Sequence, residues 1–573
     1  MGITASQSPN NSTYLPVGFQ ADRHPAVLER FEELRKRPIA SLEELKNWLL
    51  DRGTLNAFLS ERFAELFVAF SRDTGNDKKM NAYQEFVQDI SPLVAEMDQK
   101  LSIKLNASSF SRELPAGTHG IYLRNLRNSL RIYREANVRL ATEVQIRSKD
   151  YGRLFGAMTV GMDGAQLTLQ EAGLLLEGTE RRERETVYRK INDRMVQDAD
   201  TFEEIFSELL TKRNRIAANA DFDSYTDYRF ADLNRFDYQP KDCLDFHESV
   251  HSEVLPLLDR INRHRRETLQ LDRLRPWDLS TDISGRSPLR PFDGSVDLLE
   301  KSIRCLDRIN PDFGDVVRQM REAGRLDIEA RPGKRPGAYN MPMLVSGLPF
   351  LFMNATSSST DVRTFLHESG HAIHSYLIRD LRPVAARRVP SEIAELAAMS
   401  MELFSMEHWD IFYADPEDLR RARLQQLEMV LKVLPWIATI DAFQHWLYAH
   451  PDHDRAERAA AWSEIYYRFG SDEVDYQGLE DTVTYQWHKQ IHLFEVPFYY
   501  VEYGMAQLGA VALWKQYCEN PTQTIRNYRN ALELGYTRSI PEVYETAGIS
   551  FDFSKTYVRE LTTFVQEKIA ELL

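Results

Sequence analysis

The sequence has few cysteines and no long hydrophobic run, and both absences narrow the class of protein. Cys243, Cys305 and Cys518 are the only cysteines in 573 residues, and none forms a Cys-x-x-Cys pair. Cysteines this sparse favour reduced thiols in the cytoplasm over disulfides. No 18-residue apolar run is present, and the N-terminus lacks a basic region followed by an apolar one. Neither a membrane span nor a secretory signal is therefore predicted.

A basic excess and flexible linkers are also missing. The formal net charge is −15, and Lys and Arg are interleaved with acidic residues, which argues against a nucleic-acid partner. No Gly/Ser-rich or Pro-rich linker, repeat or low-complexity segment divides the chain, so we expect helical lobes that share one core. Within it we expect an N-terminal helical region at 1–150 and a catalytic region at 151–573.

The hydrophobic pattern predicts a mainly helical protein with a small β element. Charged amphipathic stretches at 41–72, 122–146, 165–215 and 241–270 are typical of helices. In contrast, residues 341–355 are apolar and β-favouring but interrupted by Gly347 and Pro349, which predicts short strands.

Residues 367–371 read His-Glu-Ser-Gly-His, and this segment indicates a hydrolytic metal site. Side chains four residues apart on a helix share a face, with Cβ atoms about 5–6 Å apart, so His367 and His371 can bind one Zn²⁺. Glu368 can then act as general base on a zinc-bound water. The alternative is a chance match, which this composition would give in roughly a few per cent of chains.

The flanking residues favour a helical metal site over a chance match. Apolar residues recur near helical spacing on a side separate from the histidines: Val362, Phe365, Leu366, Ile373 and Leu377. A mid-helix glycine costs roughly 1 kcal/mol relative to alanine, so at Gly370 we expect close approach of another helix or of substrate backbone.

The third ligand has to come from elsewhere in the chain. A metzincin is excluded, because His374 and Leu377 stand where that class has a glycine and a third histidine. The helix-favouring stretch 390–402 places Glu392, Glu395, Met399 and Glu402 on one helical face. Spacing leaves the choice between Glu392 and Glu395 open, and a solvated acidic stripe is the alternative.

Residues 337–402 combine several short motifs. Gly-Ala-Tyr, Pro-Phe-Leu-Phe-Met-Asn and Asp-Val-Arg-Thr-Phe-Leu precede His-Glu-Ser-Gly-His-Ala-Ile-His, and Glu-Leu-Ala-Ala-Met-Ser-Met-Glu follows. This combination resembles the M3 family of zinc oligopeptidases, in its oligoendopeptidase F and Pz-peptidase branch. The resemblance also covers 215–229 and 237–243, and it is weak before residue 150.

The resemblance implies which glutamate is the ligand. In that family the third ligand is a Glu followed seven residues later by another Glu, which Glu395 and Glu402 satisfy, whereas Glu392 would pair with Met399. Glu402 is then expected to hold an imidazole N–H. His374 resembles a family histidine, for which a structural or supporting role is favoured over a ligand role.

A second segment, 492–504, carries candidate donors to an oxyanion. Peptide hydrolysis makes a tetrahedral oxyanion that needs preorganised donors. With a helix start expected at Pro497, Tyr500 and Tyr503 share a face, whereas the adjacent Tyr499 does not. An aromatic core ridge is the alternative, but the resemblance implies that His492, Tyr500 and Tyr503 contact substrate and oxyanion.

Together these observations predict a zincin-type metallopeptidase in which helical lobes enclose a substrate cleft. We expect one Zn²⁺ per chain on His367, His371 and Glu395, with Glu368 as general base. The resemblance implies endopeptidase action on short unstructured peptides. A strand beside the metal helix would suit extended peptides, although an ordinary buried strand pair is the alternative.

Two other functions stay open. An exopeptidase or dipeptidyl carboxypeptidase on the same scaffold would need a cation for the terminal carboxylate, for which Arg363 and Arg388 are candidates. A non-catalytic peptide-binding protein is disfavoured by the complete motif. The sequence does not determine the cleavage preference or the oligomeric state.

Overall fold

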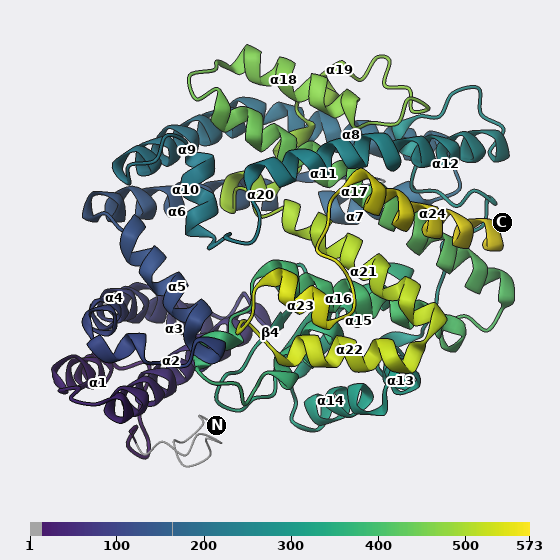
Figure 1. Ribbon diagram of the computed structural model, residues 1–573. Coiled ribbons are helices and arrows are strands. Elements are labelled where there is room, and N and C mark those ends of the chain that lie inside the picture. The colour runs from purple at the N-terminus through teal and green to yellow at the C-terminus, as the bar shows by residue number, and fades with distance from the viewer. Residues whose placement is uncertain (1–13, 163) are drawn as a thin grey trace. The chain divides into compact units, whose positions relative to one another are not determined.

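The computed structural model describes residues 14–162 and 164–573 and is mainly helical (Figure 1). The N-terminal residues on which the secretory-signal prediction rests lie outside the described part. Within the described part, no helix is both long and apolar enough to cross a membrane.

The chain divides into two compact units, each made of three separate segments. Unit 1 contains the chain up to Arg131, then Arg290–Leu419 and Gly509–Phe551. Unit 2 contains Ile132–Leu289, Arg420–Leu508 and Asp552–Leu573. The division expected after residue 150 is a different one and stays a prediction.

Unit 1 holds the N-terminal helices and a small sheet. Its helices are α1 (His24–Lys36), α2 (Leu42–Ser71), α3 (Asp77–Glu85), the π-helical turn η2 (Phe86–Ile90), α4 (Ser91–Ala107), α5 (Ala116–Ile132), α13 (Gly294–Ile309), α14 (Pro311–Glu322), α15 (Ser359–Leu377), α16 (Ser391–Met406), α22 (Pro521–Glu533) and α23 (Ile540–Thr546). The expected helix at 41–72 is confirmed: Ser41 caps α2 by accepting from the Glu44 N–H, and the helix buries Leu45, Trp48 and Leu55.

Unit 2 is helical apart from one hairpin. It contains α6 (Glu135–Gly156), β1 (Thr159–Met162), β2 (Ala165–Thr168), α7 (Leu169–Leu174), α8 (Arg181–Gln197), α9 (Ala199–Asn219), α10 (Tyr225–Asp232), α11 (Pro240–Glu253), α12 (Leu255–Thr268), α18 (Arg455–Arg468), α19 (Glu480–Thr484), α20 (Ile491–Glu495) and α24 (Lys555–Leu572). Helices α17 (Pro416–Ala449) and α21 (Val501–Glu519) each contribute residues to both units.

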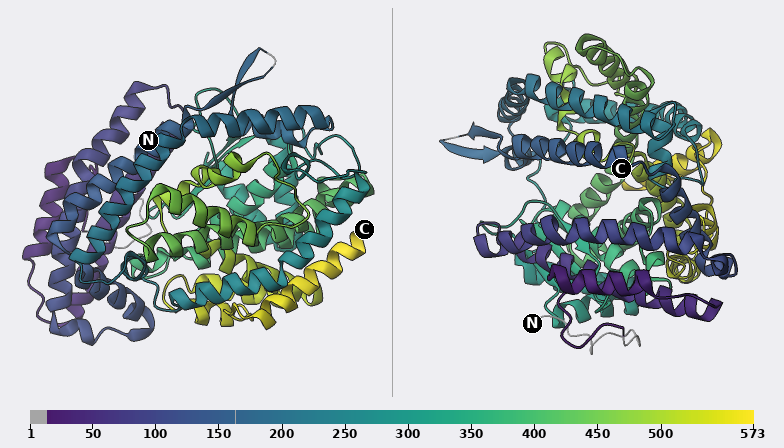
Figure 2. Two further views of the ribbon diagram at one scale, coloured as in Figure 1. Left: turned by 90° about the horizontal axis from the view of Figure 1, so that it is seen from above. Right: turned by 90° about the vertical axis from the view of Figure 1, so that its left-hand side faces the viewer.

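Three of the expected helices differ from the structure. The stretch 122–146 is divided between α5 and α6, because Arg134 is extended. The stretch 241–270 is divided between α11 and α12, where Pro256 lies in the first turn of α12 and cannot donate a backbone hydrogen bond. The stretch 165–215 begins with β2, which pairs with β1 in a hairpin that projects beyond the neighbouring helices (Figure 2).

The small sheet of unit 1 confirms one strand within 341–355, β5, whereas β4 ends at Met341, where the predicted stretch begins. Strands β3 (Leu326–Glu329), β4 (Tyr339–Met341) and β5 (Phe350–Ala355) lie in the order β3-β5-β4. β3 runs parallel to β5, and β4 antiparallel to it with Tyr339 opposite Phe352. Phe350 and Phe352 pack with Ala64 and Val68 of α2, so the N-terminal helices form part of the sheet's core.

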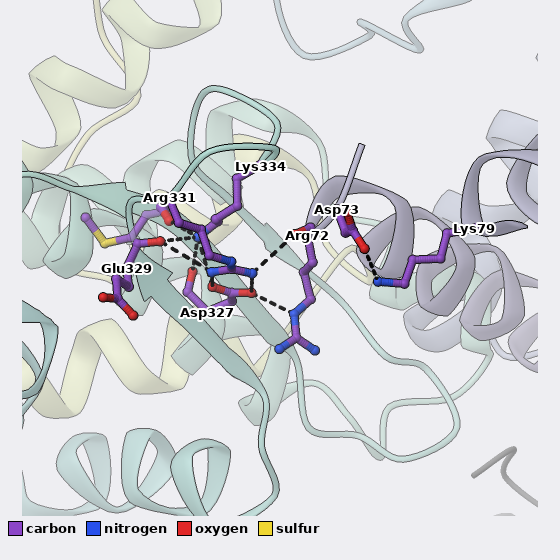
Figure 3. Close-up of polar contacts among 8 residues, drawn as sticks. Arg72, Asp73, Lys79, Asp327, Glu329, Arg331 and Lys334 are labelled. Atoms are coloured by element: carbon purple, nitrogen blue, oxygen red, sulfur yellow. Dashed lines mark hydrogen bonds and ion pairs between the residues drawn. The ribbon is translucent and has the colours of Figure 1, made fainter. Parts of the chain in front are cut away.

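A buried carboxylate holds the loop between β3 and β4 in place (Figure 3). Asp327 accepts hydrogen bonds from Arg72 at 2.6 Å, from Arg331 at 2.7 Å and from Lys334 at 2.9 Å. Lys334 also donates to the Met353 carbonyl of β5 at 2.6 Å. Burial opposes ionisation, but these cations hold the pKa of Asp327 well below its usual range. The loop is therefore fixed to β3, β5 and the end of α2.

Candidate metal centre

Helix α15 carries the His-Glu-Ser-Gly-His segment and is held firmly at its start. The Ser358 hydroxyl accepts from the Asp361 N–H, and the Asp361 carboxylate accepts from the Ser358 N–H, which forms a capping box. Val362, Phe365 and Ile373 are fully buried, and α15 contacts β4, β5, α14 and α16. The apolar face expected from the sequence thus orients the opposite face, which carries the histidines.

Helix α16 passes very close to α15 at Gly370. A Cβ atom at Gly370 would lie 2.7 Å from the Cα of Ala398 and 2.8 Å from the carbonyl oxygen of Ala397. No ordinary carbon–carbon contact is that short. The expectation that another helix approaches this glycine is therefore confirmed, and the contact places the α16 carboxylates beside the α15 histidines.

Two histidines and one glutamate converge between these helices. The Nε2 atom of His367 lies 3.4 Å from Glu395 Oε2, and the Nε2 atom of His371 lies 3.9 Å from Glu395 Oε1. One donor atom from each residue lies within 4.8 Å of the other two. Glu392 is buried nearby but is not part of this group. Of the two glutamates that spacing left open, the structure thus brings Glu395 to the histidines.

Glu402 fixes the orientation of the first histidine. His367 Nδ1 donates to Glu402 Oε1 at 2.7 Å, so Nε2 is left to face the centre. The hydrogen bond expected between Glu402 and an imidazole is thus present. His374 is buried outside the three-residue group, and burial lowers its pKa to about 4.

Electrostatics in the group favour bound positive charge. Burial lowers the pKa of His371 well below its usual value, with a smaller effect from His367. At His367 burial acts in the same direction, but Glu402, Glu395 and Glu368 outweigh it and raise the pKa to about 9. The carboxylates thus attract a proton to a buried site. A divalent cation would satisfy the same negative charges.

The residues present fit a zinc ion. Two imidazoles and a carboxylate are a common ligand set for catalytic zinc, which keeps a fourth position open. Glu395 Oε2 is buried without a hydrogen-bond partner, as expected for an oxygen that a metal would use. His367 also has the carboxylate partner that orients metal-binding histidines.

Glu368 lies beside this group and has a raised pKa. The residue is 7% exposed, and its Oε2 atom is buried without a hydrogen-bond partner. Burial, with a smaller contribution from Glu395, raises its pKa to about 7, although His367 opposes the shift. The backbone of Asn340 in β4 hydrogen-bonds to the carboxylate. The sequence contained no signal for this contact between β4 and the candidate base.

The downstream candidates lie together in unit 2. His492 belongs to α20, and its ring centroid lies 4.7 Å from that of Tyr500 and 6.0 Å from that of Tyr503. Gln490 donates to His492 Nδ1 at 2.6 Å. Burial lowers the pKa of His492 to about 4 and raises that of Tyr500 to about 12. His492 is thus neutral and Tyr500 protonated near pH 7, so the phenol can donate a hydrogen bond. Their role in catalysis stays a prediction.

Two details of this segment differ from expectation. Helix α21 begins at Val501 rather than at Pro497, because Phe498 has a positive φ of 63° that a helix cannot include. Tyr499 also packs on the cluster, with ring centroids 5.9 Å from His492 and 5.4 Å from Tyr503. Tyr499 is therefore not separate from the other two tyrosines, as helical geometry had suggested.

Arg363 and Arg388, the candidate cations for a substrate's terminal carboxylate, lie in different surroundings. Arg363 lies one helical turn before His367 on α15 and on the same face. Arg388 is exposed and lines a pocket with Asn56 and Asp98. Neither belongs to the three-residue group.

Comparisons with known proteins agree with this geometry. The profile of peptidase family M3 matches residues 174–563, and that of the peptidase M3 N-terminal domain matches residues 19–133. Oligopeptidase PepF of Bacillus subtilis is 22% identical over 336 residues, which are 58% of this chain and 49% of that protein. The plasmid oligoendopeptidase F of Lactococcus lactis subsp. cremoris is 23% identical over 414 residues, which are 71% of this chain and 66% of that protein. The match thus spans about half of the first relative and about two-thirds of the second.

The fold also has a close counterpart among solved structures. The structure of PZ peptidase A with inhibitor 2 superposes with a TM-score of 0.88 at 22% identity, over 96% of this chain and 97% of that chain. The mainly helical peptidase fold expected from the sequence is thereby confirmed.

Proposed function

The chain belongs to peptidase family M3, and on this premise we propose that it is a zinc-dependent endopeptidase that hydrolyses short unstructured peptides. The family implies zinc and peptide substrates. We propose one catalytic zinc per chain, held by His367, His371 and Glu395. The convergence of these three side chains beside the buried carboxylate of Glu368 carries the proposal.

Zinc in this position would polarise the scissile carbonyl and lower the pKa of a water molecule. Glu368 accepts a proton from the attacking water at its carboxylate, whose raised pKa matches a group that must take and then return a proton near neutral pH. The same carboxyl group then donates this proton to the leaving amine. Glu402 keeps the His367 ring in a fixed orientation throughout.

The sheet of unit 1 supports binding of an extended peptide. In the described structure β4 is an edge strand of the sheet, whose order is β3-β5-β4, and it pairs with β5 on one side. A strand at the edge of a sheet can pair with peptide backbone whatever the side chains, which suits an enzyme of broad specificity. Because Asn340 of β4 also contacts Glu368, a peptide bound along β4 would lie near the general base.

His492, Tyr500 and Tyr503 complete the proposal as donors to the oxyanion. Support comes from the family resemblance and from their chemistry: Tyr500 keeps its proton at neutral pH, and Gln490 orients His492. Removal of one oxyanion donor typically costs about 10²–10³ in kcat.

Cleavage products test the proposal directly. Peptides blocked at both ends should be cut internally, whereas an exopeptidase or dipeptidyl carboxypeptidase would require a free terminus. In the exopeptidase alternative, Arg363 would be the cation that binds the terminal carboxylate, because it lies on the same face of α15 as the proposed metal ligands. In the Glu368→Gln variant the zinc ligands remain, so zinc should be retained while turnover falls by about 10²–10⁴-fold. Substantial activity of this variant with zinc bound would refute the mechanism.

A further inference from the structure

Unit 2 contains a second convergence of metal-binding side chains that the proposed peptidase reaction does not use. Cys243 and His247 lie one turn apart on α11, and Asp441 and His445 lie one turn apart on α17. Pairs four residues apart on two helices each present two side chains to the same space. Donor atoms of Cys243, Asp441 and His445 all lie within 4.8 Å of one another.

The distances in this cluster resemble those at the first centre. Asp441 Oδ2 lies 2.9 Å from His247 Nε2 and 3.3 Å from His445 Nε2. At the first centre the corresponding distances between nitrogen and carboxylate oxygen are 3.4 Å and 3.9 Å. Neither group has to move far to coordinate an ion at the bond lengths of about 2.0–2.3 Å that zinc prefers.

Hydrogen bonds do not satisfy all the buried polar atoms of this cluster. Asp441 is fully buried, and its Oδ1 atom has no hydrogen-bond partner within the described structure. The Nε2 atom of His445 also lacks a hydrogen bond of acceptable geometry. A buried, unpartnered carboxylate oxygen costs free energy unless a further group satisfies it. Asp441 and His445 are both members of the three-residue group.

We propose that Cys243, Asp441 and His445 bind a second divalent metal ion, Zn²⁺, and that His247 holds the Asp441 carboxylate in position. A thiolate, an imidazole and a carboxylate form a mixed sulfur, nitrogen and oxygen set that suits zinc and disfavours magnesium or calcium, which prefer oxygen ligands. The ion would compensate the buried charge of Asp441 and connect α11 to α17 within unit 2. Its role is thus structural, because Cys243 and Asp441 are inaccessible to a substrate.

Cobalt substitution separates this site from the first one. The full-length protein is stripped of metal with a chelator and titrated with Co²⁺, and its absorption spectrum is recorded. Cobalt bound to a thiolate gives a charge-transfer band in the near ultraviolet, and the His367 centre contains no thiolate. We expect this band in the wild-type protein, and two zinc ions per chain in the protein as purified.

Variants assign the band to its ligands. Cys243→Ser should abolish it and lower the zinc content from two ions to one, whereas Cys305→Ser, at an equally buried cysteine, should leave both unchanged. If Cys243→Ser does not fold, Asp441→Asn and His445→Gln provide the same test through weaker cobalt binding. His247→Gln should reduce cobalt affinity by less than His445→Gln does.

A wild-type protein with one zinc and no charge-transfer band, or a band that persists in Cys243→Ser, means that the cluster is only a hydrogen-bonded network. Peptidase activity does not enter either measurement, so this proposal and the proposed function can fail independently.

Discussion

The contact at Gly370 predicts that one added methyl group weakens both stability and zinc binding. In Gly370→Ala the new Cβ would lie 2.7 Å from the Cα of Ala398. Since non-bonded carbons rarely approach closer than about 3.5 Å, α16 must retreat from α15 by about 0.8 Å. Overpacking of this kind costs about 1–3 kcal/mol, and the better helix propensity of alanine returns only about 1 kcal/mol.

The same retreat carries Glu395 away from the histidines. Metal sites tolerate deviations of about 0.2 Å in ligand distance, so a shift of about 0.8 Å should lower zinc affinity by about 10–100-fold. Competition with a chromophoric chelator measures the affinity, and thermal unfolding of the metal-free protein measures the stability. We expect both to decrease.

Gly120→Ala provides a matched control for this substitution. Gly120 also lies within a helix, α5, but a Cβ there would meet only the Ala116 methyl carbon at 3.9 Å. This variant should be stabilised by about 0.4–1 kcal/mol, with unchanged zinc affinity. If Gly370→Ala behaved like Gly120→Ala, the close approach of α16 would not position Glu395, and the account of the metal centre would be wrong.

Three further variants or conditions test the centre and its surroundings. Glu395→Ala should lose most of its zinc affinity while Glu392→Ala keeps it, as measured by zinc content after dialysis; the reverse result would make Glu392 the ligand. Tyr503→Phe should lower kcat by about 10²–10³ with little change in melting temperature, whereas Tyr467→Phe, at an exposed tyrosine, should lower neither. Equal and mild effects would assign Tyr503 to packing alone. In the metal-free protein, the pKa of His367 is raised to about 9, so the folded state holds a proton that the unfolded chain loses near pH 6.5. Stability of the metal-free protein should therefore fall between about pH 6.5 and pH 9, and urea unfolding at several pH values would show a constant stability if this proton were absent.

Local rules predicted the helix that carries the candidate metal ligands, because the signals for it lie among neighbouring residues of that helix. The spacing of His367 and His371, the base between them and the unusual Gly370 are all local signals. The choice of Glu395 over Glu392 needed the family resemblance, since both lie on the same helical face. The structure brings Glu395 to the histidines because α16 crosses α15 at Gly370, and helical periodicity does not contain that crossing.

Features that depend on distant segments or on single turn residues were harder to predict from the sequence. Strands β1 and β2 pair Met162 with Ala165, and the sequence between these residues is Asp-Gly, a known hairpin signal that the prediction of a helix at 165–215 did not use. Cys243 and Asp441 are nearly 200 positions apart, and no periodicity connects them. The positive φ of Phe498 and the packing of the next residue, Tyr499, on His492 were likewise not suggested by the sequence.

Unit 1 combines N-terminal helices with segments from later in the chain, and this limits which truncated fragments can fold. Ala64 and Val68 of α2 cover Phe350 and Phe352, and Arg72 at the end of that helix donates to Asp327. A fragment that began after the N-terminal helices would expose two phenylalanines of the sheet beside the metal helix. The N-terminal helices therefore contribute to the core of the sheet that packs against α15, and a deletion that removes them should destabilise this sheet.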